Sequence, residues 1–117
     1  MERTPHFAIP DELEFLTFFG SEPRAKAPAD GFWLYEVADE RDVRIRLSLK
    51  VLERSVQTVV TVHGQNVDTV SSEGATQLAI TASELRCEFE GRDWKTTLKL
   101  QIRPAIKVSW STLQISG

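Results

Sequence analysis

The stretch that decides the fold runs from residue 43 to residue 51 and reads VRIRLSLKV. Every second residue is aliphatic, and the residues between them are polar or basic. Side chains alternate between the two faces of a β-strand, so this pattern predicts a strand with one dry face and one wet, basic face. It is the clearest strand pattern in the chain.

The same period of two recurs along the chain after residue 31. Further strands are expected at residues 32–37, 56–63, 67–70, 77–81, 85–90 and 94–103, and Ile106, Val108 and Trp110 point one way on a last strand. Turns are expected at 64–66 and 71–74. About seven or eight short strands with turn signals and no helices between them predict a mainly β (α+β) fold, either an antiparallel sandwich or a strongly curved sheet.

The sequence Gly91-Arg92-Asp93 predicts a hairpin turn between two of these strands. The two strands should pair antiparallel, with Phe89 and Trp94 on the same face. Glu88 and Glu90 would then face Lys95 or Lys99 on the outer face, where opposite charges pair across strands. This pairing explains the two carboxylates without a catalytic role.

The N-terminal part of the chain predicts one helix, over residues 10–20. Negative charge at its start and Gly20 at its end are typical helix boundaries, and Leu13 and Leu16, with Phe15 and Phe19, make its apolar face. Residues 21–31 (SEPRAKAPADG) are expected to form a loop. The helix is expected to cover an open edge or end of the β region. The chain is thus expected to be a single domain, 1–117, with its antiparallel β region at 32–113.

Charge and hydropathy limit the partners. The 117 residues carry a net charge of −3, which argues against nucleic acid as the main partner and mildly favours a basic one. The N-terminal sequence MERTPH has an acid and a proline where a signal peptide needs an apolar run, and no stretch approaches the length of a membrane helix. The sequence therefore predicts a cytoplasmic protein with no membrane partner.

No catalytic motif is recognisable in the sequence. Cys87 is the one cysteine, and it shares the apolar face of its strand with Leu85 and Phe89, so we expect it to be buried and unreactive. The two histidines, His6 and His63, lie far apart in sequence and do not favour a metal site. We therefore expect no catalytic residue, no metal and no cofactor.

The candidate residues for partner binding lie in one segment. Four acids in seven residues are either a solvated loop or a surface that attracts a basic partner. The aromatic run just before them is large on both faces, so one of its faces needs cover from the helix, a subunit or a partner. The candidates are Trp33, Tyr35, Glu36, Asp39, Glu40 and Asp42.

A basic stripe follows these residues on the next strand. Arg44, Arg46 and Lys50 share its polar face, where they could track phosphates or simply face solvent. The net negative charge of the chain favours the solvated face.

Several segments resemble a known group of proteins. The helix ending in Phe18-Phe19-Gly20-Ser21-Glu22-Pro23, the aromatic strand Phe32–Tyr35 and the closing sequence LKLQIRPAIKVSW at 98–110 are similar to small bacterial immunity proteins that are encoded beside polymorphic or contact-dependent growth inhibition toxins. The resemblance implies a cytosolic antitoxin that blocks one cognate toxin by direct binding. It implies no catalytic residues, because such proteins act by occlusion.

Two other classes of function stay open on the sequence alone. A carrier of a small molecule or lipid would use the interior of a curved sheet, which the bulky inward residues leave little room for. An enzyme of an unrecognised type is the other alternative.

Overall fold

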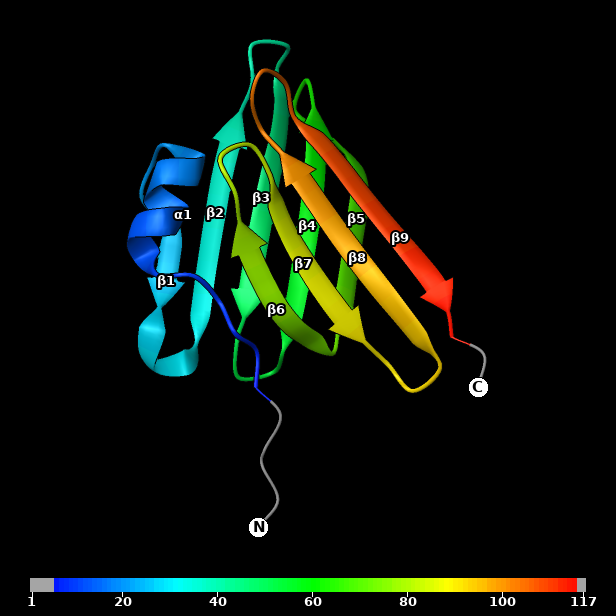
Figure 1. Ribbon diagram of the computed structural model, residues 1–117. Coiled ribbons are helices and arrows are strands. Elements are labelled where there is room, and N and C mark those ends of the chain that lie inside the picture. Colours follow the sequence, from blue (N-terminus) through cyan, green and yellow to red (C-terminus); the bar gives the residue numbers. More distant parts are fainter. Residues whose placement is uncertain (1–5, 116–117) are drawn as a thin grey trace.

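Nine antiparallel strands and one α-helix make up residues 6–115, the part of the chain that the computed structural model describes (Figure 1). One sheet contains, in spatial order, β1 (Ala25–Ala27), β2 (Phe32–Ala38), β3 (Val43–Lys50), β4 (Ser55–Val62) and β5 (Gln65–Glu73). The second contains β6 (Ala75–Ile80), β7 (Leu85–Glu90), β8 (Trp94–Gln101) and β9 (Lys107–Gln114). The predicted mainly β fold with an N-terminal helix is confirmed, and its two sheets make it a sandwich.

The interior is filled from both sheets. The alternating residues of β3 point inward as predicted, and Ile45, Leu47 and Leu49 are fully buried. From the facing sheet, Leu98 and Leu100 of β8 are buried just as completely. A polar contact also joins the sheets, because the indole Nε1 of Trp110 donates a hydrogen bond of 2.9 Å to Oγ1 of the buried Thr58.

The chain passes from one sheet to the other at a single glycine. The prediction of a turn over 71–74 was wrong, because β5 continues to Glu73 and only Gly74 separates it from β6. Gly74 has a φ of +83°, and a Cβ there would lie 2.7 Å from the carbonyl oxygen of Glu90. Both facts require glycine. The preceding turn is also shorter than predicted, since β5 already begins at Gln65.

The predicted hairpin between β7 and β8 is confirmed. The strands pair antiparallel, with Glu90 opposite Lys95 and Arg86 opposite Lys99. Glu88 lies 3.7 Å from the Lys95 ammonium and 3.6 Å from the Arg86 guanidinium on the outer face. Side chains on the two strands therefore keep the parity that the sequence indicated.

Helix α1 (Glu12–Phe19) begins after a capping box, in which Asp11 accepts a hydrogen bond from the backbone N–H of Glu14, and it ends at Gly20 in the left-handed conformation. Its buried residues are Phe15, Phe18 and Phe19. The predicted inward position of Leu13 was wrong: its side chain is 67% exposed. Three phenylalanines over five residues already fill the face that docks.

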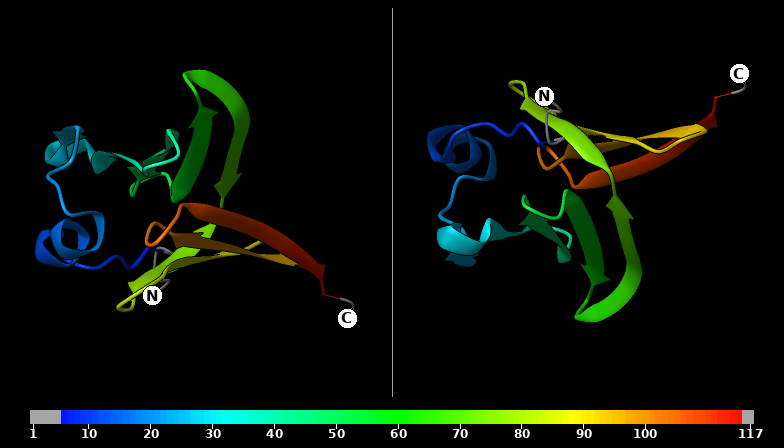
Figure 2. Two further views of the ribbon diagram at one scale, coloured as in Figure 1. Left: turned by 90° about the horizontal axis from the view of Figure 1, so that it is seen from above. Right: turned by 90° about the horizontal axis from the view of Figure 1, so that it is seen from below.

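The helix closes the open side of the sandwich. Figure 2 shows α1 between the two sheets, and α1 contacts both β2 and β6. Tyr35 of β2 stacks on Phe15 and Phe19, with ring centroids 4.9 and 4.7 Å apart. Phe7, just before the helix, is also buried, and Ala8 pairs with Gln77 on the edge of β6. The expected role of the helix as a cover is thus the one that the structure has.

The segment 21–31 is more ordered than the predicted loop. It contains β1, which pairs with β2 and places Lys26 opposite Trp33, and a short 3-10 helix, η1 (Pro28–Asp30). Sequence reasoning missed β1 because AKA is only 3 residues long and lies between prolines.

The aromatic stack gives a stability prediction. Replacing Tyr35 with alanine should lower the free energy of unfolding by about 3–5 kcal/mol, because removing a buried ring leaves a cavity against two phenylalanines. Tyr35→Phe keeps the stack and should cost far less. The control, Leu13→Ala, removes an exposed side chain and should change stability by less than about 0.5 kcal/mol. Chemical denaturation measures all three, and equal losses for Tyr35→Ala and Leu13→Ala would contradict the assignment.

A second prediction concerns Cys87, which is fully buried as expected. Burial, with a smaller effect of the nearby Glu88 charge, raises the pKa of its thiol well above the usual range. Since thiolate is the reactive form, a thiol reagent at neutral pH should label the native protein slowly and the denatured protein fast. Rapid labelling of the native protein would show that the strand opens or that the thiol is accessible.

Candidate functional site

Asp39 builds the turn between β2 and β3. Its Oδ1 accepts hydrogen bonds from the backbone N–H groups of Arg41 (2.8 Å) and Val43 (3.2 Å). Its Oδ2 accepts one from the backbone N–H of Ile106 (3.1 Å), in the segment that leads into β9. One carboxylate thus shapes the turn and ties it to the second sheet.

These bonds determine the ionisation of Asp39. Burial alone raises the pKa, but the backbone N–H groups of Ile106, Val43 and Arg41, together with the Arg41 guanidinium at 3.2 Å, outweigh it. The pKa falls from 3.8 to about 2. Hydrogen bonds to the charged form have this effect. Asp39 is therefore a structural anion, although the sequence placed it among the binding candidates.

Glu40 and Asp42 are the outward-facing acids of this turn. Glu40 is exposed. The carboxylate of Asp42 lies 3.4 Å from Nδ1 of His63, and both side chains are largely solvent-accessible. Asp42 adopts a positive φ of 60°, a conformation that aspartate tolerates better than most residues. These two carboxylates remain available to a partner.

Three arginine side chains surround the carboxylate of Glu36. Its side chain is only 7% exposed, and it contacts the guanidinium groups of Arg24 (3.6 Å), Arg44 (2.9 Å) and Arg46. Burial raises the pKa of Glu36, but the hydrogen bonds from Arg46 and Arg44 and the charges around it lower it overall. The surface around Glu36 is therefore basic, where the sequence suggested an acidic one.

A groove opens beside the turn, with a volume of about 880 Å³. It lies between the C-terminal end of α1, the end of β2 and the segment after β8. Apolar side chains and charged ones share its wall: Phe19, Ser21, Glu36, Val37, Ala38, Asp39, Glu40, Ile102, Arg103 and Pro104. Arg103 holds one side of it, since Nη1 donates to the carbonyl oxygen of Phe18 at 3.1 Å.

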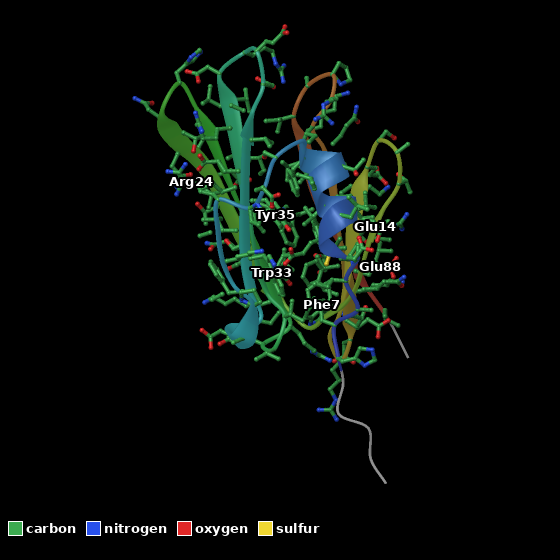
Figure 3. The ribbon with its side chains drawn as sticks, turned by 90° about the vertical axis from the view of Figure 1, so that its left-hand side faces the viewer. Phe7, Glu14, Arg24, Trp33, Tyr35 and Glu88 are labelled. Carbon is green, nitrogen blue, oxygen red and sulfur yellow. The ribbon has the colours of Figure 1, made fainter. Side chains whose placement is uncertain are left out.

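The two aromatic candidates belong to the core side of β2. Figure 3 shows Trp33 and Tyr35 facing the helix, with Arg24 on the opposite side of the sheet. Tyr35 is buried, and burial, with the charges of Glu12 and Glu22, raises its pKa to about 12. Trp33 is half-buried, and its Nε1 donates to Oε1 of Glu12 at 3.2 Å. Helix α1 therefore covers the face of β2 that carries Trp33 and Tyr35.

The structure thus brings four of the six candidates to one end of the sandwich and separates their roles. Glu36 and Asp39 are held by the protein itself, and Glu40 and Asp42 face solvent. Sequence reasoning missed the groove residues Ile102, Arg103 and Pro104. It also missed the Glu36–Arg46 pair, although strand parity across a short turn could have indicated it.

The described residues, 6–115, include no group of three or more His, Cys, Asp or Glu side chains that could hold a metal ion. In the same part of the chain, no helix is both long enough and apolar enough to cross a membrane.

No family model matches the sequence, and no curated protein matches it. A solved structure does match: a chain of a contact-dependent growth inhibition toxin–immunity protein complex from Klebsiella pneumoniae 342. The TM-score is 0.86, and the match covers 94% of this chain and 100% of that one. The two chains share one fold. At 24% sequence identity, the likeness agrees with the resemblance seen in the sequence at the level of the fold.

The ionisation of Asp39 predicts a pH dependence of stability. A carboxyl group whose pKa is lower in the folded state stabilises the fold above its usual pKa and loses this contribution as the pH falls through the folded value. Asp39→Asn should therefore lower the melting temperature at pH 7, and the difference from wild type should shrink between about pH 4 and pH 2. Asp42→Asn, on the solvent side of the same turn, is the control. A difference that stays constant over this range would contradict the role of Asp39.

Proposed function

We propose that this chain is an immunity protein that neutralises a cognate bacterial toxin in the cytoplasm by binding it directly, without catalysis. The observation that carries the proposal is the fold, which extends over the whole length of a chain from a toxin–immunity complex. The aromatic strand and the closing segment at 98–110 support it from the sequence.

A toxin–immunity complex holds two kinds of protein, and this chain has the features of the immunity protein. Ionisable groups whose pKa is shifted have structural explanations: Asp39 binds backbone N–H groups, Glu36 binds arginines and Cys87 is buried. Perturbed groups in an enzyme site usually lie ready for substrate. Since these groups stabilise the fold instead of facing a substrate, they favour the immunity protein over the toxin.

The surface that we assign to the toxin is the end groove with the exposed acids beside it. Glu40 lines the groove, and Asp42 follows on the same turn. Apolar wall residues can receive a projecting side chain, while the carboxylates attract a basic surface and raise the association rate. Trp33 and Tyr35 support this surface indirectly, because they hold α1 against β2.

The proposed function requires that a gene next to this chain's own encode a toxin domain, and the test uses that domain. Co-expression with this chain should restore growth of a bacterium that the toxin domain arrests, and the two proteins should purify as one complex. Expression of this chain alone should not slow growth, and an unrelated toxin domain is the specificity control. Absence of both protection and binding, or toxicity of this chain alone, would overturn the proposal.

Charge reversal tests the surface separately. The double variant Glu40→Lys/Asp42→Lys should slow association with this toxin domain by about tenfold or more at low salt and weaken its salt dependence, because steering charges act over about a Debye length. Asp39 stays unchanged, since its reversal would break the turn. The matched control is Asp68→Lys/Glu73→Lys on the exposed strand β5. If both double variants slow association equally, only net charge matters and the turn is not the interface.

A further inference from the structure

Three arginines lie together on the outer face of the five-stranded sheet. Arg24 precedes β1, and Arg44 and Arg46 lie on β3. All three contact one carboxylate, that of Glu36, and their side chains are 61%, 45% and 48% exposed. Three positive charges against one negative charge leave a net charge of +2. This arginine cluster is basic on a chain that is acidic as a whole.

Glu36 holds the arginines in place before any partner arrives. The contacts to its carboxylate are made by Nη1 of Arg24, Nη1 of Arg44 and Nε of Arg46. A guanidinium carries several N–H donors in a rigid plane, so donors remain that can point to solvent. Because ordering a long side chain costs entropy on binding, arginines that are already fixed bind an anion more favourably.

The surroundings of the cluster resemble a protein interface. Leu34 and Val59, half-buried on strands β2 and β4, lie on the same outer face, with Val59 opposite Arg46. Lys50 extends the basic side along β3. Arginine is itself among the residues that are enriched at interfaces and in their hot spots.

Resting on the proposed function, we infer that the arginine cluster Arg24–Arg44–Arg46 is a second contact for the toxin and receives aspartate or glutamate side chains from its surface. Carboxylates match the planar guanidinium in bidentate geometry. Nucleic acid is disfavoured as the occupant, because phosphate binding relies on many cations along a track. Here the cluster is short, and the acidic turn with Glu40 and Asp42 follows directly on the same hairpin.

The cluster and the acidic turn would together make the interface dipolar. A toxin surface must then present positive charge to the turn and negative charge to the arginines. Such an arrangement fixes the orientation of the partner, and it repels toxins whose charges are placed differently.

The experiment measures binding to the same toxin domain by surface plasmon resonance. The double variant Arg24→Ser/Arg44→Ser leaves Arg46 to neutralise Glu36, and it should raise Kd by about tenfold or more. The matched control, Arg86→Ser/Lys99→Ser, makes the same charge change on the outer face of the other sheet. If the double variant unfolds, Arg24→Ser alone serves, because Arg24 is the most exposed of the three and the most distant from Glu36.

The outcomes separate the two proposals. If wild-type protein does not bind the toxin domain, the proposed function fails and this inference fails with it. If wild type binds and the arginine variant binds equally well, or no worse than the control, the function stands and the arginine cluster is not a contact. A short DNA duplex is the second probe. If wild type binds the duplex through the same arginines more tightly than it binds the toxin, carboxylates are not the occupant.

Discussion

The stacking of Tyr35 on Phe15 and Phe19 is the contact on which the rest of the structure depends. Within residues 6–115, Gly74 is the one direct connection from a strand of one sheet to a strand of the other, and each sheet packs apolar side chains against the other. On the side of β1, β2 and β6, no strand of residues 6–115 bridges the edges of the two sheets, and α1 closes this side. The helix is too short to be stable alone. The aromatic rings therefore hold the cover in place and also determine where the end groove opens.

Strand parity is a local property, and it was predictable. The alternation at 43–51 predicted which side chains of β3 are buried, and the hairpin at Gly91 predicted the pairing of β7 with β8. What failed depends on contacts between distant segments. The residues expected to form a turn at 71–74 instead end β5 and cross to the other sheet at Gly74. Glycine is required there because the carbonyl oxygen of Glu90, distant in sequence, lies 2.7 Å from where a Cβ would be. Leu13 has the helical spacing of a core residue, but the docked face was decided by the phenylalanines.

The charge of the surface around the candidate residues was harder to predict than the positions of the acids in the sequence. Four acids between residues 36 and 42 are visible in the sequence, but their net effect depends on their neighbours. The backbone N–H of Ile106 reaches Asp39 from the far end of the chain, and Arg24 reaches Glu36 through a strand that the sequence did not indicate. A run of acidic residues in the sequence is therefore a weak guide to the surface potential. Arginines and backbone N–H groups from distant segments can compensate the charge of the acids that become buried.

The strand order also has a consequence for how the chain acquires its structure. Every strand pairs with the strand before or after it, so each sheet can form by successive hairpins that close short loops. The helix is the exception, because it contacts β2 and β6, whose sequences lie well after its own. During synthesis on a ribosome, α1 emerges before both of these strands and is docked only after them. Until β6 has emerged, Phe15, Phe18 and Phe19 lack part of the surface that buries them.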